Sequence, residues 1–301
     1  MASGLVLIDK PQGWTSHDIV AKLRGIAGTR RVGHAGTLDP MATGLLLLGV
    51  NAGTKLLTFL VGEGKTYEAK IRLGASTISD DAEGDLVALA DADIVRAIEA
   101  NQIEAELANL RGEIMQVPSS VSAIKVDGER AYAKVRGGDE VKLAARPITV
   151  SRFEITSTPK LVETDSGAFL DFDAIIECSS GTYIRALARD LGNALGVGGH
   201  LTALRRTRIG SYRVEDSLPM GELTRENLSI TSMFDSVKEA FEIRELSEHE
   251  VVDLRHGKRI ESKGATSAEI AAVFEGKLIA MLEPVANQLK SSVVFALESD
   301  D

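Results

Sequence analysis

Apolar and polar positions alternate in parts of this chain and predict a protein that mixes strands with helices. Every second residue from Tyr67 to Leu73 is apolar, as in a strand with one buried face. The segment 168–178 alternates in the same way. Two short apolar runs, 5–8 and 45–50, are typical of buried strands. The pattern therefore indicates several strands distributed along the chain.

Helical spacing recurs between these strands. Thr15 or Ser16 is suited to cap a helix whose apolar positions continue to about Ile26. A short helix is expected at 54–61 and another after 183. The longest helical pattern runs from 92 to 112, and we expect a single helix there.

Length and composition limit the class of protein. The chain has 301 residues, of which 44% are hydrophobic and 26% charged, typical of a globular protein with one large and one small domain. No apolar run approaches the roughly 20 residues that span a bilayer. Cys178 is the only cysteine, which excludes an intrachain disulfide and suits a reducing compartment. We expect a cytoplasmic protein that does not bind membranes.

The charge is unevenly distributed. A net charge of −10 is unusual for a protein that binds nucleic acid. Residues 181–210, however, contain five arginines and one aspartate, so this part is locally basic. Residues 211–250 contain ten acidic and four basic residues, and we expect a helical acidic connector there. Local RNA binding is therefore compatible with the overall charge.

The loop at 33–44 carries the strongest candidate for chemistry. Gly33, Gly36 and Pro40 punctuate it, and the proline pushes Asp39 toward an extended backbone. The loop runs directly into the apolar strand predicted at 45–50. Taken alone, such an aspartate often bonds amides of its own turn. The residues leave both interpretations open, a structural turn and a nucleophile held in a stiff loop.

This loop reads Gly33-His34-Ala35-Gly36-Thr37-Leu38-Asp39-Pro40-Met41-Ala42-Thr43-Gly44. It resembles the signature of the tRNA pseudouridine-55 synthases (the TruB family), Gly-His-x-Gly-x-Leu-Asp-Pro-x-Ala-x-Gly, and fills every fixed position. The resemblance covers about residues 5–213 through further motifs in order: Asp9-Lys10-Pro11-Gln12-Gly13-Trp14-Thr15-Ser16, Lys65-Thr66-Tyr67, Ser179-Ser180-Gly181-Thr182-Tyr183-Ile184-Arg185 and Leu204-Arg205-Arg206. Residues 74–84 resemble the family's Leu-Gly-x-x-Thr-Asp-Thr-x-Asp-x-x-Gly turn at Thr77, Asp81 and Gly84, and we expect a surface turn there. Ile78 and Ser79 replace the usual Asp and Thr, which puts the RNA contacts of that turn in doubt.

The resemblance implies roles for individual residues. Asp39 is the expected nucleophile, and Arg185 is expected to pair with it. Tyr67 is expected to stack on the target base and assist proton transfer. The implied substrate-binding residues are His34, Tyr183 and Leu204. Neither a metal ion nor an organic cofactor is expected, because the isomerisation involves no redox change and no net hydrolysis.

The same resemblance implies the fold. It predicts an α+β catalytic domain over 1–232, built on a mixed, mainly antiparallel sheet with flanking helices. An RNA-closing insertion is expected at about 115–143. Residues 233–301 are expected to form the acidic connector and a small β-rich domain that resembles the PUA class of RNA-binding modules. Fold class and reaction therefore follow from the resemblance, and not from periodicity.

The implied function is isomerisation of uridine 55, in the T-loop of tRNA, to pseudouridine. The expected partner is the T-arm stem-loop, with no obligatory protein partner and a monomeric enzyme. Two alternatives remain: a guide-RNA-dependent synthase, which would need partner proteins, and a tRNA-folding chaperone, whose activity would survive loss of Asp39. The sequence leaves open whether Asp39 attacks uracil C6, attacks ribose C1′ or assists through a glycal intermediate.

Overall fold

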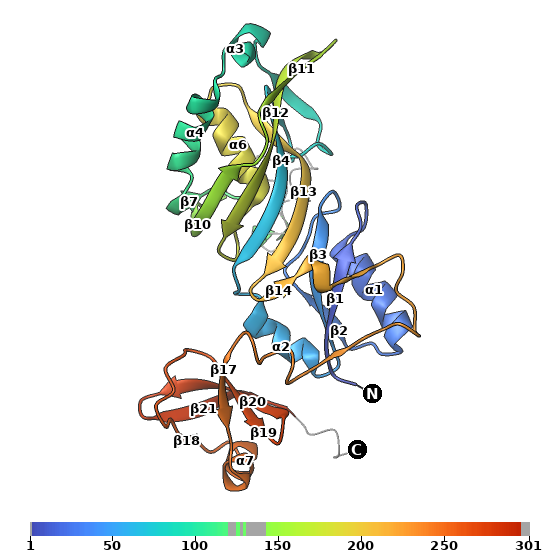
Figure 1. Ribbon diagram of the computed structural model, residues 1–301, viewed down its shortest axis with the longest axis vertical. Coiled ribbons are helices and arrows are strands. Elements are labelled where there is room, and N and C mark those ends of the chain that lie inside the picture. Colours follow the sequence, from blue (N-terminus) through green and yellow to red (C-terminus); the bar gives the residue numbers. More distant parts are fainter. Residues whose placement is uncertain (1, 120–124, 127–128, 131–142, 296–301) are drawn as a thin grey trace. The chain divides into compact units, whose positions relative to one another are not determined.

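The computed structural model describes residues 2–119, 125–126, 129–130 and 143–295, and Figure 1 shows its helices and strands. The chain forms two compact units. The first consists of Met1–Asp39, Leu45–Gly62 and Gly210–Asp301, and the second of Pro40–Gly44 and Glu63–Ile209. Most of the predicted insertion at 115–143 lies outside the described residues. The predicted domain boundary between 232 and 233 stays a prediction.

The first unit begins with a small sheet and two helices. Its elements are β1 (Gly4–Lys10), α1 (Ser16–Ala27), β2 (Val32–Ala35), β3 (Thr43–Val50) and α2 (Gly53–Leu60). β1 lies beside β3 in the sheet, and β2 pairs antiparallel with residues 47–50 of β3. Side chains of α1, including Ile19 and Leu23, pack onto Leu46 and Leu48 of β3. The strands and helices predicted here are confirmed.

The acidic stretch differs from its prediction, because residues 211–241 form no α-helix. They contain β14 (Tyr212–Arg213), the 3-10 helix η1 (Val214–Asp216), β15 (Leu218–Pro219) and β16 (Thr231–Ser232), joined by turns. Hydroxyl and amide side chains bond the local backbone: the Ser217 Oγ donates to the Val214 carbonyl, and the Asn227 Oδ1 accepts from the Thr224 N–H at 2.7 Å. Such bonds compete with the hydrogen bonds of a helix. The prediction of a helical connector was therefore wrong.

The C-terminal part of the first unit has a sheet of its own. Its elements are β17 (Glu242–Glu245), α7 (Glu248–Arg255), β18 (Ile260–Glu261), β19 (Ile270–Phe274), β20 (Lys277–Val285) and β21 (Gln288–Val294). The strand order is β17-β19-β20-β21-β18, antiparallel except between β17 and β19. Val251 and Leu254 of α7 pack into the apolar cluster of this sheet. The β-rich C-terminal module is confirmed.

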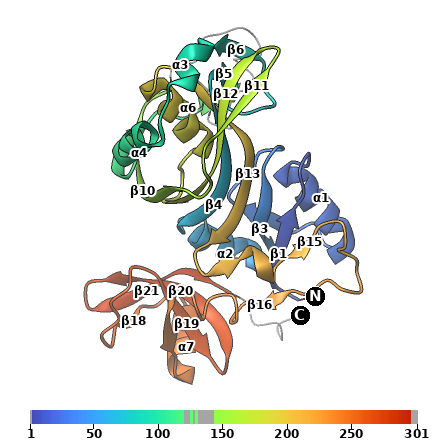
Figure 2. The same ribbon diagram turned by 45° about the horizontal axis from the view of Figure 1, so that its top comes forward.

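The second unit is built on long antiparallel strands. Its elements are β4 (Lys65–Leu73), β5 (Ala75–Thr77), β6 (Leu86–Leu89), α3 (Ala92–Arg96), α4 (Ala100–Asn109), β7 (Gly112–Gln116), β8 (Lys125–Val126), β9 (Glu129–Arg130), β10 (Arg146–Ile155), β11 (Lys160–Thr164), β12 (Gly167–Cys178), α6 (Ile184–Ala194) and β13 (Gly199–Ile209). The strand order β13-β4-β12-β10-β7 is antiparallel throughout, and β11 pairs with β12. Figure 2 shows β13, β4 and β12 running side by side. This arrangement confirms the mainly antiparallel α+β class.

Local sequence explains where these elements lie. The apolar face of β4 is buried from Tyr67 to Leu73, as its alternation predicts. The apolar stripe of α6 packs against β13 and β4. The single helix expected at 92–112 was wrong, because α3 ends at Arg96 and α4 begins after Glu99. Glu99 has an extended backbone, and its N–H bonds the Gln102 side chain in a capping box, which starts a new helix.

Candidate active site

Asp39 lies in the irregular loop between β2 and β3 and is half-buried. The residue before it is held on both sides by one hydroxyl. Ser16 Oγ accepts from the Leu38 N–H at 2.9 Å and donates to the Leu38 carbonyl at 3.1 Å. Ser16 itself is 1% exposed, at the start of α1. The first motif therefore holds the backbone that carries Asp39.

The turn before α1 is fixed by its own polar groups. Lys10 is fully buried, and its Nζ donates to the carbonyls of Pro11 at 3.0 Å and Trp14 at 2.6 Å. Thr15 caps the helix in a capping box with Asp18. These bonds fix the direction from which Ser16 reaches the Asp39 loop. A buried polar group is costly unless it is bonded, and here each of these groups bonds a neighbour.

His34 lies on β2, opposite Leu48 of β3. Its ring meets the ring of His17 edge to face, with 5.7 Å between the centroids. His17 is exposed on α1, whereas His34 is half-buried. The two imidazoles therefore lie together at the end of the first unit's small sheet, near the start of the Asp39 loop.

The loop that follows Asp39 enters the second unit. Thr43 and Gly44 pair parallel with Arg205 and Arg206 of β13. Gly44 has a φ of 99°, and a Cβ there would lie 2.8 Å from the Arg206 backbone nitrogen, so only glycine fits this approach. Arg206 is also the partner of Tyr67 in the β13–β4 register. Gly44, Arg206 and Tyr67 thus lie on one rung of the sheet.

Leu204 and Tyr183 lie at the same end of β4 as Tyr67. Leu204 is buried opposite Ala69, and its carbonyl is 3.5 Å from Thr43 Oγ1. β12 ends at Cys178, opposite Lys65, and the chain then turns through Tyr183 into α6. The topology of the second unit therefore brings Tyr67, Tyr183 and Leu204 to one end of its central strands.

Arg185 projects from the first turn of α6 and is 5% exposed. Its Nη1 donates to the Ser79 carbonyl at 2.6 Å, lies 3.4 Å from Ser119 Oγ, and lies 3.4 Å from Asp81 Oδ2. Figures 1 and 2 show α6 beside α4, with which it packs. The pairing of Arg185 with Asp39 stays a prediction.

The turn expected on the surface at 74–84 is buried at its centre. Ser79, Asp80 and Asp81 are all buried, although Ile78 is exposed. The surface assignment was therefore wrong, because the polar groups of this turn meet arginines of α6 instead of water. Arg189 Nη1 lies 3.2 Å from Asp80 Oδ2, and Arg185 Nη1 forms an ion pair with Asp81. Burial raises the pKa of the Asp80 carboxyl, and the neighbouring Arg189 opposes this rise.

Sequence reasoning assigned no site role to several residues that contact the predicted ones. They are Ser79, Asp81, Gln116 and Ser119, which contact Arg185 or Tyr183, and Ser16 likewise bonds Leu38, the neighbour of Asp39. Asp81 matches a fixed aspartate of the family's turn, which was a usable signal. Gln116 and Ser119 lie at the start of the segment predicted to be an RNA-closing insertion, and no local pattern marks either residue for a role in the site.

Two titrating groups lie opposite each other where β4 meets β12. Burial lowers the pKa of the Lys65 ammonium to about 8, and burial raises the pKa of the Cys178 thiol to about 11. Because the unfolded lysine binds its proton up to its ordinary 10.5, stability rises with pH above about 8. The unfolded thiol loses its proton near 9.0 while the folded thiol keeps it, which lowers stability above that pH.

These opposite slopes predict the behaviour of Cys178→Ala. Below pH 9 the free energy of unfolding of the variant should depend on pH in the same way as that of the wild type. Between pH 9 and 10.5 the difference between the two, variant minus wild type, should increase by about 1–2 kcal/mol, because only the lysine contributes to the slope of the variant. Urea unfolding of both proteins at several pH values measures this difference. Parallel curves across the whole range would contradict the prediction.

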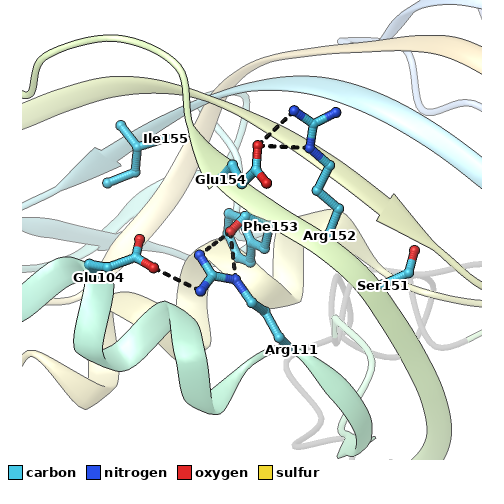
Figure 3. Close-up of a pocket in the computed structure, with 7 residues that line it drawn as sticks. All are labelled: Glu104, Arg111, Ser151, Arg152, Phe153, Glu154 and Ile155. Carbon is cyan, nitrogen blue, oxygen red and sulfur yellow. Dashed lines mark hydrogen bonds and ion pairs between the residues drawn. The ribbon is translucent and has the colours of Figure 1, made fainter.

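A separate hollow of about 460 Å³ lies on the second unit, lined by Glu104, Arg111, Ser151, Arg152, Phe153, Glu154 and Ile155 (Figure 3). Its charges are paired among themselves: Arg111 bonds Glu104 and the Phe153 carbonyl, and Arg152 bonds Glu154. None of the predicted site residues lines it.

Among the described residues, no group of three or more His, Cys, Asp or Glu side chains is arranged to hold a metal ion. Within the same part of the chain, no helix is long and apolar enough to cross a membrane.

Comparison with solved structures supports the fold. A Cbf5-Nop10-Gar1 complex matches with a TM-score of 0.72 at 23% identity, covering 98% of this chain and 86% of the other. The structure of an H/ACA RNP bound to a substrate RNA containing 2'-deoxyuridine matches with a TM-score of 0.70 at 22% identity, covering 98% and 85%. At this identity the likeness concerns the fold alone.

Sequence comparison is more specific. A protein of Arthrobacter sp. (strain FB24) named tRNA pseudouridine synthase B is 53% identical, covering 98% of this chain and 97% of its own length. A protein of Thermobifida fusca (strain YX) with the same name is 50% identical, covering 98% and 99%. Three family models match in succession: TruB family pseudouridylate synthase (N terminal domain) at 24–184, tRNA pseudouridylate synthase B C-terminal domain at 185–245, and tRNA Pseudouridine synthase II, C terminal at 241–296. The chain therefore belongs to the TruB family of pseudouridylate synthases.

Proposed function

We propose that this enzyme converts the uridine at position 55, in the T-loop of tRNA, to pseudouridine. The reaction breaks the bond between uracil N1 and ribose C1′, turns the base and rejoins it through C5, which releases the C5 proton. The name shared by the near-full-length relatives supports tRNA as the substrate. The filled Gly33–Gly44 signature supports position 55 as the target.

In this proposal Asp39 is the nucleophile. The observation that carries it is the path of its loop: the hydroxyl of Ser16 fixes the backbone before Asp39, and five residues later the chain pairs with Arg206, itself opposite Tyr67. A carboxylate is an established covalent catalyst. Bound RNA expels water from such a site, and loss of water disfavours the ionised carboxylate. Arg185 would keep Asp39 ionised by supplying a nearby cation.

The remaining residues are assigned to the substrate. Tyr67 provides an aromatic face for the flipped uracil, and stacking of this kind is worth about 1–3 kcal/mol per base. Tyr183 and Leu204 line the nucleotide pocket, and His34 supports the loop from which the base is flipped. Buried Lys65 and Arg206 add positive charge at the same end of β4, which favours the RNA backbone despite the acidic total.

The enzyme is proposed to act alone, as a monomer. Identity of 50–53% with bacterial proteins over nearly the whole chain favours this assignment over a guide-RNA-dependent synthase, since the Cbf5 complexes are only 22–23% identical. A tRNA-folding chaperone would not need the Asp39 carboxylate. Both alternatives become outcomes of the experiment below.

The test uses purified protein and an unmodified T-arm stem-loop whose uridines carry tritium at C5. We expect one tritium to be released per stem-loop with no added protein or guide RNA. A stem-loop with cytidine at the target position is the control and should release none. If neither the stem-loop nor whole tRNA releases tritium, the stand-alone assignment is wrong, and the guide-dependent and chaperone alternatives lead.

A further inference from the structure

The side chain of Gln116 bonds both main-chain groups of a single residue. Its Oε1 accepts from the Tyr183 N–H at 2.9 Å, and its Nε2 donates to the Tyr183 carbonyl at 3.0 Å. Gln116 is 2% exposed and ends β7, the edge strand of the sheet. The two residues are 67 positions apart in the sequence. A buried amide whose two groups bond the N–H and the carbonyl of one residue fixes the two peptide planes on either side of that residue.

These two peptide planes lie where α6 begins. Tyr183 is the N-cap of α6, and no side chain of its own caps the helix. Its carbonyl also accepts the first helical bond, from the Leu187 N–H at 3.2 Å. Gln116 therefore fixes the residue that sets the start and direction of the helix. Arg185 follows two residues later, in the first turn.

The residues after Gln116 reach the same network. The Val117 carbonyl accepts from Arg189 Nη2 at 2.7 Å. Ser119 Oγ donates to the Ser79 carbonyl at 3.2 Å, and Arg185 bonds this same carbonyl. The segment 116–119 thus contacts α6 at its N-cap residue Tyr183, at Arg185 and, one turn later, at Arg189. A shift of the Tyr183 peptide would move the Arg185 guanidinium relative to the 79–81 turn.

We propose that Gln116 is a positioning residue for pseudouridine formation, acting through the Tyr183 main chain on both Tyr183 and Arg185. It touches neither substrate nor reacting atoms. The inference rests on the proposed roles of these two residues. Displacement of a catalytic group by about 1 Å can cost 10²-fold in rate, so loss of these two bonds should reduce the chemical step more than RNA binding.

The test compares Gln116→Met with a matched control, Gln102→Met. Gln102 also bonds the main chain of a helix N-cap, since its Oε1 accepts from the Glu99 N–H at 2.8 Å at the start of α4. Gln102 has no bond to Tyr183 or Arg185 among the described contacts of the second unit. Two measurements are made on each protein: hydrogen exchange of the amides at 183–188, and the single-turnover rate at saturating stem-loop RNA together with its Kd.

We expect Gln116→Met to speed amide exchange at 183–188 and to lower the single-turnover rate by about 10- to 100-fold, with Kd within about twofold. Gln102→Met should change neither. Unchanged exchange at 183–188 would overturn the inference, and so would faster exchange at an unchanged rate, which would mark a purely structural role. Should Gln116→Met fail to fold, Gln116→Glu takes its place. Its carboxylate keeps the acceptor for the Tyr183 N–H but faces the Tyr183 carbonyl with an oxygen instead of a donor, so the same gain in exchange and loss of rate are expected and the same two results would overturn the inference.

The exchange measurement needs no substrate. An inactive wild type would therefore count against the proposed function, while unchanged exchange in Gln116→Met would count against the role of Gln116. The two failures are distinguishable.

Discussion

Asp39→Ala is expected to lower pseudouridine formation by on the order of 10⁴-fold or more while RNA binding stays within about threefold. The reason is that the carboxylate is proposed to form the bond on which the reaction depends, whereas RNA is held by stacking and by backbone contacts elsewhere. Asp39→Asn should be equally inactive, although the amide keeps the shape of the side chain. Tritium release at saturating stem-loop measures the rate, and filter binding measures Kd.

A matched control keeps the charge change but moves it away from the site. Asp91 accepts from the Asp93 N–H at 2.8 Å at the start of α3. Asparagine is as good a cap as aspartate, so Asp91→Asn should retain the wild-type rate within about twofold. A rate within tenfold of wild type for Asp39→Asn would remove the carboxylate from the mechanism. Weak binding by Asp39→Ala would instead place Asp39 in substrate recognition.

The sequence predicted those parts of the fold whose signal is local. Alternation from Tyr67 to Leu73 placed β4 and its buried face, and α6 packs against this strand. The apolar stripe after Tyr183 placed α6. The 33–44 loop marked Asp39 through its glycines, its proline and the family resemblance. Each of these patterns lies within about a dozen residues, where sequence and structure are directly coupled.

The rest depends on contacts between distant segments. Ser79 and Asp81 have the composition of a surface turn, but Arg185, more than 100 positions later, buries them. Ser16 reaches Leu38 across 22 positions, and Gln116 reaches Tyr183 across 67. Local propensity contains no information on such pairs, so a polar turn is assigned to the surface by default. The sequence thus predicted the residues proposed to react and missed the groups that hold them.

Arg185→Lys is expected to lower the rate of pseudouridine formation by about 10²- to 10³-fold. One guanidinium nitrogen, Nη1, donates to the Ser79 carbonyl and lies 3.4 Å from both Ser119 Oγ and Asp81 Oδ2, and the planar fork sets the geometry of these contacts. An ammonium is a point charge at the end of a side chain with shorter overall reach, and it does not reproduce this geometry. Burial also disfavours a charged lysine more than a charged arginine, so the site would lose part of its positive charge at neutral pH.

The control for Arg185→Lys is Arg72→Lys. Arg72 forms a two-bond pair with Asp171, Nε to Oδ1 at 2.8 Å and Nη2 to Oδ2 at 2.7 Å, between β4 and β12. Lysine there loses the same kind of pairing, so the melting temperature should fall while the single-turnover rate stays within about threefold. If both variants lose rate in proportion to their loss of stability, Arg185 only supports the fold. A large loss of rate in Arg185→Lys with a melting temperature no lower than that of Arg72→Lys assigns the guanidinium to catalysis, since the two proteins then differ only in where the fork is lost.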